Sequence, residues 1–195
     1  MELKEDLMKM AGNKKKKRIE FVRMTQERVG AAYTDVMPWN SPERVVDTFG
    51  PFLGNSAVEY FFAAALNCRA EPAAIQLMGV GGVDSCQANV ADILKFALVS
   101  NAHSIILVHN HPSGYPGPSR EDRTLTCRVE EACQMVGLKL TDHIIIGGDG
   151  YGYSIHGETY VEIRNTGGTA GCLDRERHPG KGENHLCTRE YPRLA

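Results

Sequence analysis

Residues 104–122 read SIILVHNHPSGYPGPSRED, and this stretch decides the fold. Its first five residues are nearly all apolar, which is typical of a central strand that is covered on both faces. A loop rich in proline and glycine follows. Ser119 then begins a helix whose apolar residues recur at helical spacing until Gly137 ends it. A strand, a loop and a helix in this order predict an α/β sheet domain.

Further elements are predicted on both sides of this stretch. They are a helix from Ser41 that ends at Gly50-Pro51, strands over 60–66 and 73–78, a loop of Gly79, Gly81 and Gly82, a helix from Asn89, and last strands over 138–140 and 143–146. Because helices and strands are interleaved, we expect a single α/β domain of the α+β type over residues 19–162.

The two ends of the chain differ from this central part. The 195 residues are 42% hydrophobic, which suffices for a buried core, and the net charge of −2 argues against a protein that coats nucleic acid through its whole surface. Residues 1–18 end in the run KKKKR, which predicts a solvated basic arm and, as the alternative, a nucleic-acid contact. Residues 163–195 are rich in glycine and have no sustained apolar period, which predicts a disordered tail.

Hydropathy and cysteine usage predict a cytoplasmic protein without membrane contact. We find no apolar run near the roughly 18 residues that a membrane-spanning helix needs. The first six residues, MELKED, are too charged for a signal peptide. The six cysteines are scattered without a C-x-x-C pair, which favours thiols in a reducing compartment over a disulfide framework.

Three polar residues of the central stretch form a candidate metal site. His109 and His111 are two apart on extended chain, so both imidazoles can point to the same side. Asp122 lies in the first turn of the following helix and can supply a carboxylate. Two histidines and one carboxylate are the donor set of an open catalytic zinc site. The alternatives are that Ser119 and Asp122 only cap the helix, and that the histidines are exposed loop residues.

The same residues resemble a known family. The sequence His-Asn-His-Pro-Ser-Gly at 109–114, followed by Ser119 and then Asp122, is similar to the metal-binding motif of the JAB/MPN metalloprotease superfamily. That motif is His-x-His, seven residues, Ser, two residues, Asp. The match most resembles the RadC-like branch, in the short form that contains only the JAB domain, and it covers roughly residues 40–155.

The resemblance implies a fold, a cofactor and roles for individual residues. The fold would be a curved mixed sheet flanked by helices, with His109, His111 and Asp122 as ligands of Zn²⁺. Glu59 matches the family's catalytic glutamate and would act as general base, and Ser119 would position the scissile carbonyl or stabilise the oxyanion. The chain would then be a zinc metallopeptidase or isopeptidase that acts on a peptide or protein, including isopeptide-linked ones. Ligand types alone also permit iron, cobalt or manganese.

Two other functions remain open at this point. The RadC resemblance carries a link to DNA repair, and the basic residues at 14–18 could contact phosphates, which would make the chain a DNA-binding protein. A metal-stabilised scaffold without catalysis is the second alternative. The chain also departs from the family, because Gln87-Ala88-Asn89-Val90 replaces the usual His-Pro-Arg-Glu stretch. That change concerns the substrate groove rather than the metal ligands.

The remaining histidines give weaker indications. His103 is predicted at the surface or in a turn, and His156 carries no signal. Asp142 could hydrogen-bond a ligating imidazole, or it could simply cap local backbone. The cysteines and histidines of the tail fit no standard zinc spacing.

Overall fold

The computed structural model describes residues 23, 25–31, 38–81, 88–148 and 150–162. The predicted arm at 1–18 and tail at 163–195 lie outside these residues. The described elements are α2 (Pro42–Leu53), β1 (Glu59–Leu66), β2 (Pro72–Gly81), α3 (Val90–Val99), β3 (Ser104–Asn110), α4 (Arg120–Met135), β4 (Lys139–Ile146), β5 (Tyr151–Ser154) and β6 (Thr159–Glu162). They form an α+β domain, which confirms the predicted fold class.

The six described strands form one open, mixed sheet in the order β2-β1-β3-β4-β5-β6. The pair β3–β4 is parallel, and the other neighbours are antiparallel. Parallel neighbours need a crossover, and α4 provides it between β3 and β4. The carboxyl end of β3 and the first turn of α4 therefore meet at one edge of the sheet.

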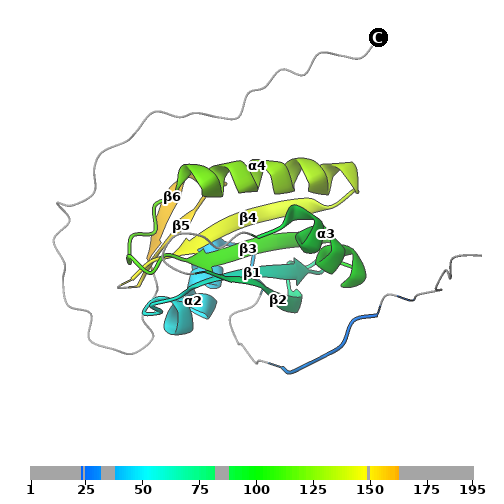
Figure 1. Cartoon of the computed structure of the whole chain (residues 1–195), viewed down its shortest axis with the longest axis horizontal. Helices are drawn as coiled ribbons and strands as arrows, with labels where there is room; N and C mark the ends of the chain where they lie inside the picture. The colour runs from blue at the N-terminus through cyan, green and yellow to red at the C-terminus, as the bar shows by residue number, and fades with distance from the viewer. Residues whose placement is uncertain (1–22, 24, 32–37, 82–87, 149, 163–195) are drawn as a thin grey trace, which may run out of the picture.

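Helices cover both faces of the sheet (Figure 1). Successive residues of a strand point to opposite faces, so Ile106 and Val108 of β3 pack with the α2 side, whereas Ile105 and Leu107 pack with α3 and α4. All seven residues of β3 are buried, as its apolar sequence predicts. Burying each of these aliphatic side chains contributes about 1.5–3 kcal/mol.

Helix α2 is longer than its sequence predicts. It begins at Pro42 after Ser41, as expected, but it continues through Gly50-Pro51 to Leu53. Proline here removes only one backbone donor near the helix end. Beyond it, Leu53 is buried and Phe52 packs against Phe49 and Phe62, so tertiary contacts extend the helix.

The second strand is also longer than predicted. Gly79 and Gly81 were expected in a loop, but they belong to β2 and pair with Phe61 and Glu59 of β1. A bulge between the pairs of Phe61 and Phe62 accommodates the extra residue of β2. Gly82 lies outside the described residues.

The last part of the sheet differs from the prediction as well. The two strands expected over 138–140 and 143–146 are a single strand, β4, with a register irregularity opposite the Ile105–Ile106 step that lets it pass Thr141. Strands β5 and β6 were not predicted because each has only four residues.

The two other helices begin as predicted: Asn89 caps α3, and Ser119 caps α4. Over the described residues, no helix combines the length and hydropathy needed to cross a membrane.

Candidate metal centre

The candidate site lies where β3 ends and α4 begins. His109 pairs with Phe61 of β1 and with Ile145 of β4, and it continues the row of Ile105 and Leu107 that faces α4. Its side chain is fully buried, which excludes the alternative of an exposed loop residue. The ring stacks on Phe61 with a centroid distance of 5.5 Å.

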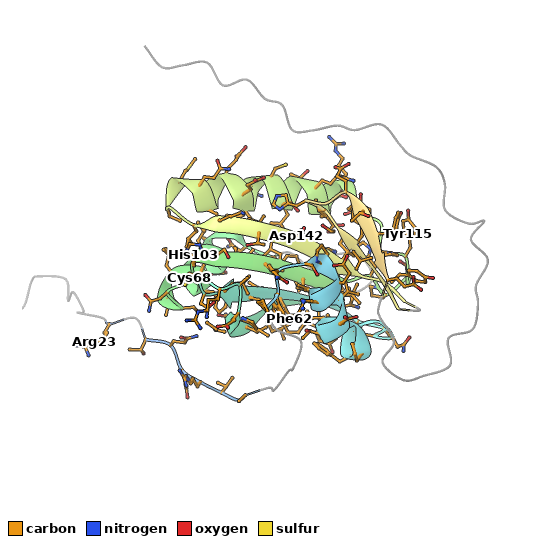
Figure 2. The ribbon with its side chains drawn as sticks, turned by 180° about the vertical axis from the view of Figure 1, so that it is seen from behind. Arg23, Phe62, Cys68, His103, Tyr115 and Asp142 are labelled. Atoms are coloured by element: carbon orange, nitrogen blue, oxygen red, sulfur yellow. The ribbon has the colours of Figure 1, made fainter. Side chains whose placement is uncertain are left out.

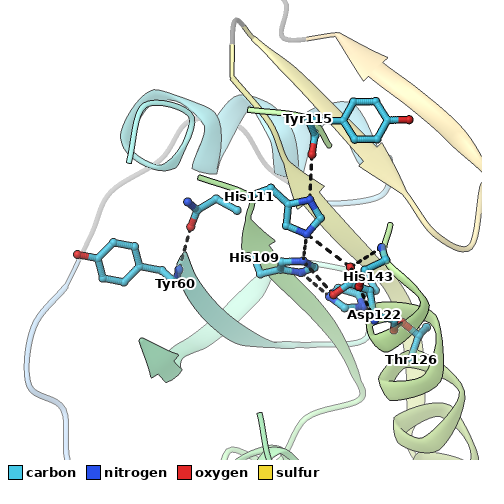
Figure 3. Close-up of polar contacts among 9 residues, drawn as sticks. Tyr60, His109, His111, Tyr115, Asp122, Thr126 and His143 are labelled. Atoms are coloured by element: carbon cyan, nitrogen blue, oxygen red, sulfur yellow. Dashed lines mark hydrogen bonds and ion pairs between the residues drawn. The ribbon is translucent and has the colours of Figure 1, made fainter. Parts of the chain in front are cut away.

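Three side chains converge at this edge (Figure 3). The Nε2 atoms of His109 and His111 are 3.0 Å apart. The Asp122 carboxylate places Oδ1 at 3.2 Å from His109 Nε2 and Oδ2 at 3.5 Å from His111 Nε2. In the part of the chain that the structure describes, these three residues form the group whose ligand atoms lie within 4.8 Å of one another.

The spacing of these atoms fits a tetrahedral metal. Zinc ligands lie about 2.0–2.1 Å from the ion, so two of them at tetrahedral corners are separated by about 3.3 Å. The observed separations of 3.0 Å, 3.2 Å and 3.5 Å bracket that value. Two imidazoles and a carboxylate are also ligand types that zinc accepts. His109, His111 and Asp122 could therefore hold a metal ion.

The loop after β3 fixes the ring of His111. Its Nδ1 donates a hydrogen bond of 2.9 Å to the carbonyl oxygen of Tyr115, which leaves Nε2 as the ring nitrogen that faces His109 and Asp122. Gly114, with φ of 79°, makes the turn that brings this carbonyl back. A Cβ on Gly147 would lie 2.6 Å from the carbonyl oxygen of Gly114, so the loop needs glycine there to pack closely.

The helix cap fixes Asp122. Ser119 Oγ accepts from the backbone N–H of Asp122, while Ser119 donates to Asp122 Oδ2 from its own backbone N–H at 2.7 Å and from its hydroxyl at 2.6 Å. The capping box proposed as an alternative is therefore present, and it coexists with the histidine contacts. Burial acts to raise the pKa of Asp122, yet hydrogen bonds with His109, His111 and Ser119 hold that pKa well below its ordinary range.

Glu59 stands at the start of β1 on the same face as Phe61. It feels the charges of all three clustered residues, although burial is the largest influence and raises the pKa of Glu59 above its ordinary value. Asn110, between the two histidines, accepts from the backbone N–H of Tyr60 at 2.9 Å and donates to the carbonyl oxygen of Val58 at 3.0 Å. One side chain thus holds the backbone on both sides of Glu59.

Comparison with known proteins agrees with this geometry. The family profile described as "RadC-like JAB domain" matches residues 39–160, more than half of the chain. The chain belongs to this family. A UPF0758 protein of Caldanaerobacter subterraneus is 38% identical over 123 residues, which are 63% of this chain and 52% of that protein. A UPF0758 protein of Streptococcus gordonii is 42% identical over 107 residues, which are 55% of this chain and 47% of that protein. The chain thus spans about half the length of these relatives.

The sequence assigned no role to one polar residue that the structure places behind the candidate metal centre. His143 of β4 is fully buried, and its Nε2 lies 2.8 Å from Nδ1 of His109. Burial holds the pKa of His143 well below its ordinary value, and the neighbouring charge of His109 acts in the same direction. The sequence marked His143 as part of the RadC-like stretch 142–147, at the start of an otherwise apolar run, but it assigned the residue no role.

Asp142 does not contact the imidazole of His109 or His111, so the first of its two interpretations is wrong. Its carboxylate accepts from the backbone N–H groups of His143 and His156 and from the hydroxyl of Ser154, which agrees with the alternative of a backbone cap. His103 is exposed before β3, as predicted. Figure 2 shows His103 and Tyr115 at opposite ends of the domain, and because Tyr115 contacts His111, His103 lies far from the candidate metal centre.

Proposed function

We propose that this RadC-like JAB domain is a zinc-dependent amide hydrolase, a metallopeptidase or isopeptidase that cleaves a peptide or protein in the cytoplasm. The observation that carries the proposal is the convergence of two Nε2 atoms and a carboxylate at tetrahedral spacing, with a second carboxylate, Glu59, beside them. This is the composition of a catalytic site that keeps one metal position open for water or substrate.

His109, His111 and Asp122 would hold the ion. A bound Zn²⁺ lowers the pKa of water and polarises an amide carbonyl. The ligand types would also accept iron, cobalt or manganese, and zinc is proposed because imidazole and carboxylate in an open tetrahedral set suit it best.

Glu59 would be the general base. It takes a proton from the attacking water and delivers it to the leaving amine nitrogen, so the carboxylate returns to its starting state. Its raised pKa suits this task, because a base whose pKa approaches the working pH also becomes a competent acid once it has been protonated. Asn110 keeps the backbone around Glu59 fixed to β3, next to the ligands.

Ser119 would have two tasks at this site. Its hydroxyl and backbone N–H orient the Asp122 carboxylate, and the hydroxyl would donate to the substrate carbonyl oxygen, where negative charge develops. A hydroxyl can turn from one acceptor to the other, so the two tasks are compatible.

The experiment uses the full chain loaded with Zn²⁺, a library of quenched fluorescent peptides and a lysine isopeptide conjugate. We expect cleavage that a chelator stops and added Zn²⁺ restores. Glu59→Gln should keep the metal and lose cleavage, whereas the control Glu158→Gln, at an exposed ion pair with Arg123, should keep both. A zinc-loaded protein that cleaves no probe would contradict the proposal and would support the alternative of a metal-stabilised scaffold without catalysis. Salt-sensitive DNA binding without cleavage would support the alternative of a DNA-binding protein that contacts phosphates through the basic residues 14–18, which lie outside the described residues.

A further inference from the structure

A buried chain of hydrogen bonds joins the strand and helix sides of the metal centre (Figure 3). It begins at His109 Nδ1, which contacts His143 Nε2 at 2.8 Å. His143 Nδ1 then contacts the Thr126 hydroxyl at 2.7 Å, and that hydroxyl contacts the backbone carbonyl oxygen of Asp122 at 2.7 Å. This series of hydrogen bonds thus runs from the side chain of one proposed ligand, His109, to the backbone of another, Asp122.

The direction of every hydrogen bond in this chain follows from its last link. A carbonyl oxygen only accepts, so Thr126 must donate its single hydroxyl proton to Asp122. The hydroxyl oxygen must then accept from His143, which places the ring proton of His143 on Nδ1. His143 is fully buried and neither ring nitrogen contacts a carboxylate, so the ring is neutral and its Nε2 can only accept.

The last consequence falls on His109. Its Nδ1 must carry the proton that His143 accepts, so Nε2 is the ring nitrogen that faces His111 and Asp122 and is left for a metal. The fully buried ring stacks on Phe61, which also limits its rotation.

We infer that His143 and Thr126 are positioning residues that lock His109 in the Nδ1-protonated tautomer and thereby set the affinity of the centre for its metal. This inference rests on the proposed function only in taking His109 Nε2 as a ligand atom. Partners of this kind typically change metal affinity about 10–100-fold when they are lost.

The first test measures the affinity of the full chain for Zn²⁺ alone, by competition with a chromophoric chelator. His143→Phe keeps the ring shape but removes both hydrogen bonds, so the affinity should fall about 10–100-fold. His143→Gln retains an acceptor for His109 and should restore most of it. Thr126→Val should lower the affinity by a smaller factor. The control Thr124→Val removes a hydroxyl of α4 whose one partner among the described residues is the Arg120 carbonyl, and it should leave the Zn²⁺ affinity unchanged.

The second test reads the tautomer without any metal. Nitrogen–proton NMR correlation of the histidine rings in the metal-free chain should show His109 protonated at Nδ1, and His143→Phe should admit the Nε2-protonated form. This readout holds even if the wild type binds no zinc, so failure of the proposed function and failure of this inference can be told apart. If His143→Phe does not fold, the test rests on the position of the ring proton of His109 in the wild type and on the Zn²⁺ affinities of His143→Gln and Thr126→Val.

Three results would overturn the inference. One is a folded His143→Phe variant with wild-type affinity for Zn²⁺. Another is a His143→Gln variant that binds as weakly as His143→Phe. The third is a wild-type His109 that carries its proton on Nε2.

Discussion

Two mostly buried carboxylates, Asp122 at the start of α4 and Asp142 in β4, sit in this domain in opposite electrostatic settings. The oxygens of Asp122 contact two imidazole nitrogens and the cap residue Ser119, and its pKa is lowered. Those of Asp142 accept from two backbone N–H groups and a hydroxyl, and burial raises its pKa. Burial is common to both, so it does not distinguish the candidate metal ligand. Convergence with two imidazole side chains does.

The largest expected difference between the two is in metal binding. Asp122→Ala removes a proposed ligand, so it should weaken Zn²⁺ binding by more than the roughly 10–100-fold that losing an outer partner costs. Asp142→Asn should leave binding within a few-fold of wild type, because Asp142 contacts none of the three clustered residues through its side chain. Chelator competition on both purified variants gives the comparison. Equal losses in the two would contradict it.

Glu59 extends the comparison from binding to catalysis. Glu59→Gln removes the proton acceptor but keeps the shape, so the hydrolytic rate should drop about 10²–10⁴-fold while the metal stays bound. Rate and zinc content are measured on the same sample. A variant with full activity would show that another group is the base.

Asn110 and Asn67 provide the next contrast, since they lie near opposite ends of β1. Asn110→Ala releases the backbone around Glu59, and a displacement of about 1 Å can cost roughly 100-fold in rate. Asn67 organises the turn between β1 and β2 through bonds to the N–H groups of Arg69 and Glu71. Asn67→Ala should therefore lower stability without a change in the rate per folded molecule. Initial rates corrected for the folded fraction separate the two effects.

The structural task of Asp142 should appear in the free energy of unfolding. Asp142→Ala leaves three donors without their acceptor, which should cost about 2–4 kcal/mol. Asp142→Asn can still accept from both N–H groups and donate to Ser154, so its cost should be smaller. Urea unfolding of the metal-free proteins measures both costs. An alanine variant as stable as the wild type would contradict a structural role for Asp142.

The smallest effect is a pH dependence at the same residue. The pKa of Asp142 is raised in the folded state, so the folded protein binds its proton more tightly than the unfolded chain does. That contribution is fully present below the ordinary carboxyl pKa and is lost as the pH rises through the folded pKa. Relative to Asp142→Asn, the wild type should lose stability over that window. Unfolding curves for the metal-free proteins over a pH series test the sign, and an opposite trend would contradict it.

The sequence brought the three residues of the candidate metal site together better than it predicted their surroundings. His109, His111 and Asp122 belong to one continuous stretch, where strand and helix periodicity already place them together. Glu59 is fifty residues away in the chain, and only the family resemblance indicated it. His143 and Thr126 could not be found, because their meaning depends on the parallel pairing of β3 with β4 and on which face α4 covers.

The same limit explains the errors in the fold. Local signals at Gly50-Pro51 and Gly79 favoured an end to regular structure, but packing of Leu53 and pairing with β1 extended α2 and β2 beyond them. Thr141-Asp142 suggested a break in β4, yet the strand continues because Ser154 and nearby N–H groups satisfy the buried carboxylate. Short-range patterns predicted the elements, and tertiary contacts set their lengths.

Metal binding by His109, His111 and Asp122 is tested most directly by titrating the metal-free full chain with Co²⁺ and recording the visible absorption. The wild type and the distant control His103→Ala should each bind one ion per chain with the intense bands of a four-coordinate site. The double variant His109→Ala/His111→Ala should lose those bands. An unchanged spectrum and stoichiometry in the double variant would contradict the claim that these residues hold the metal.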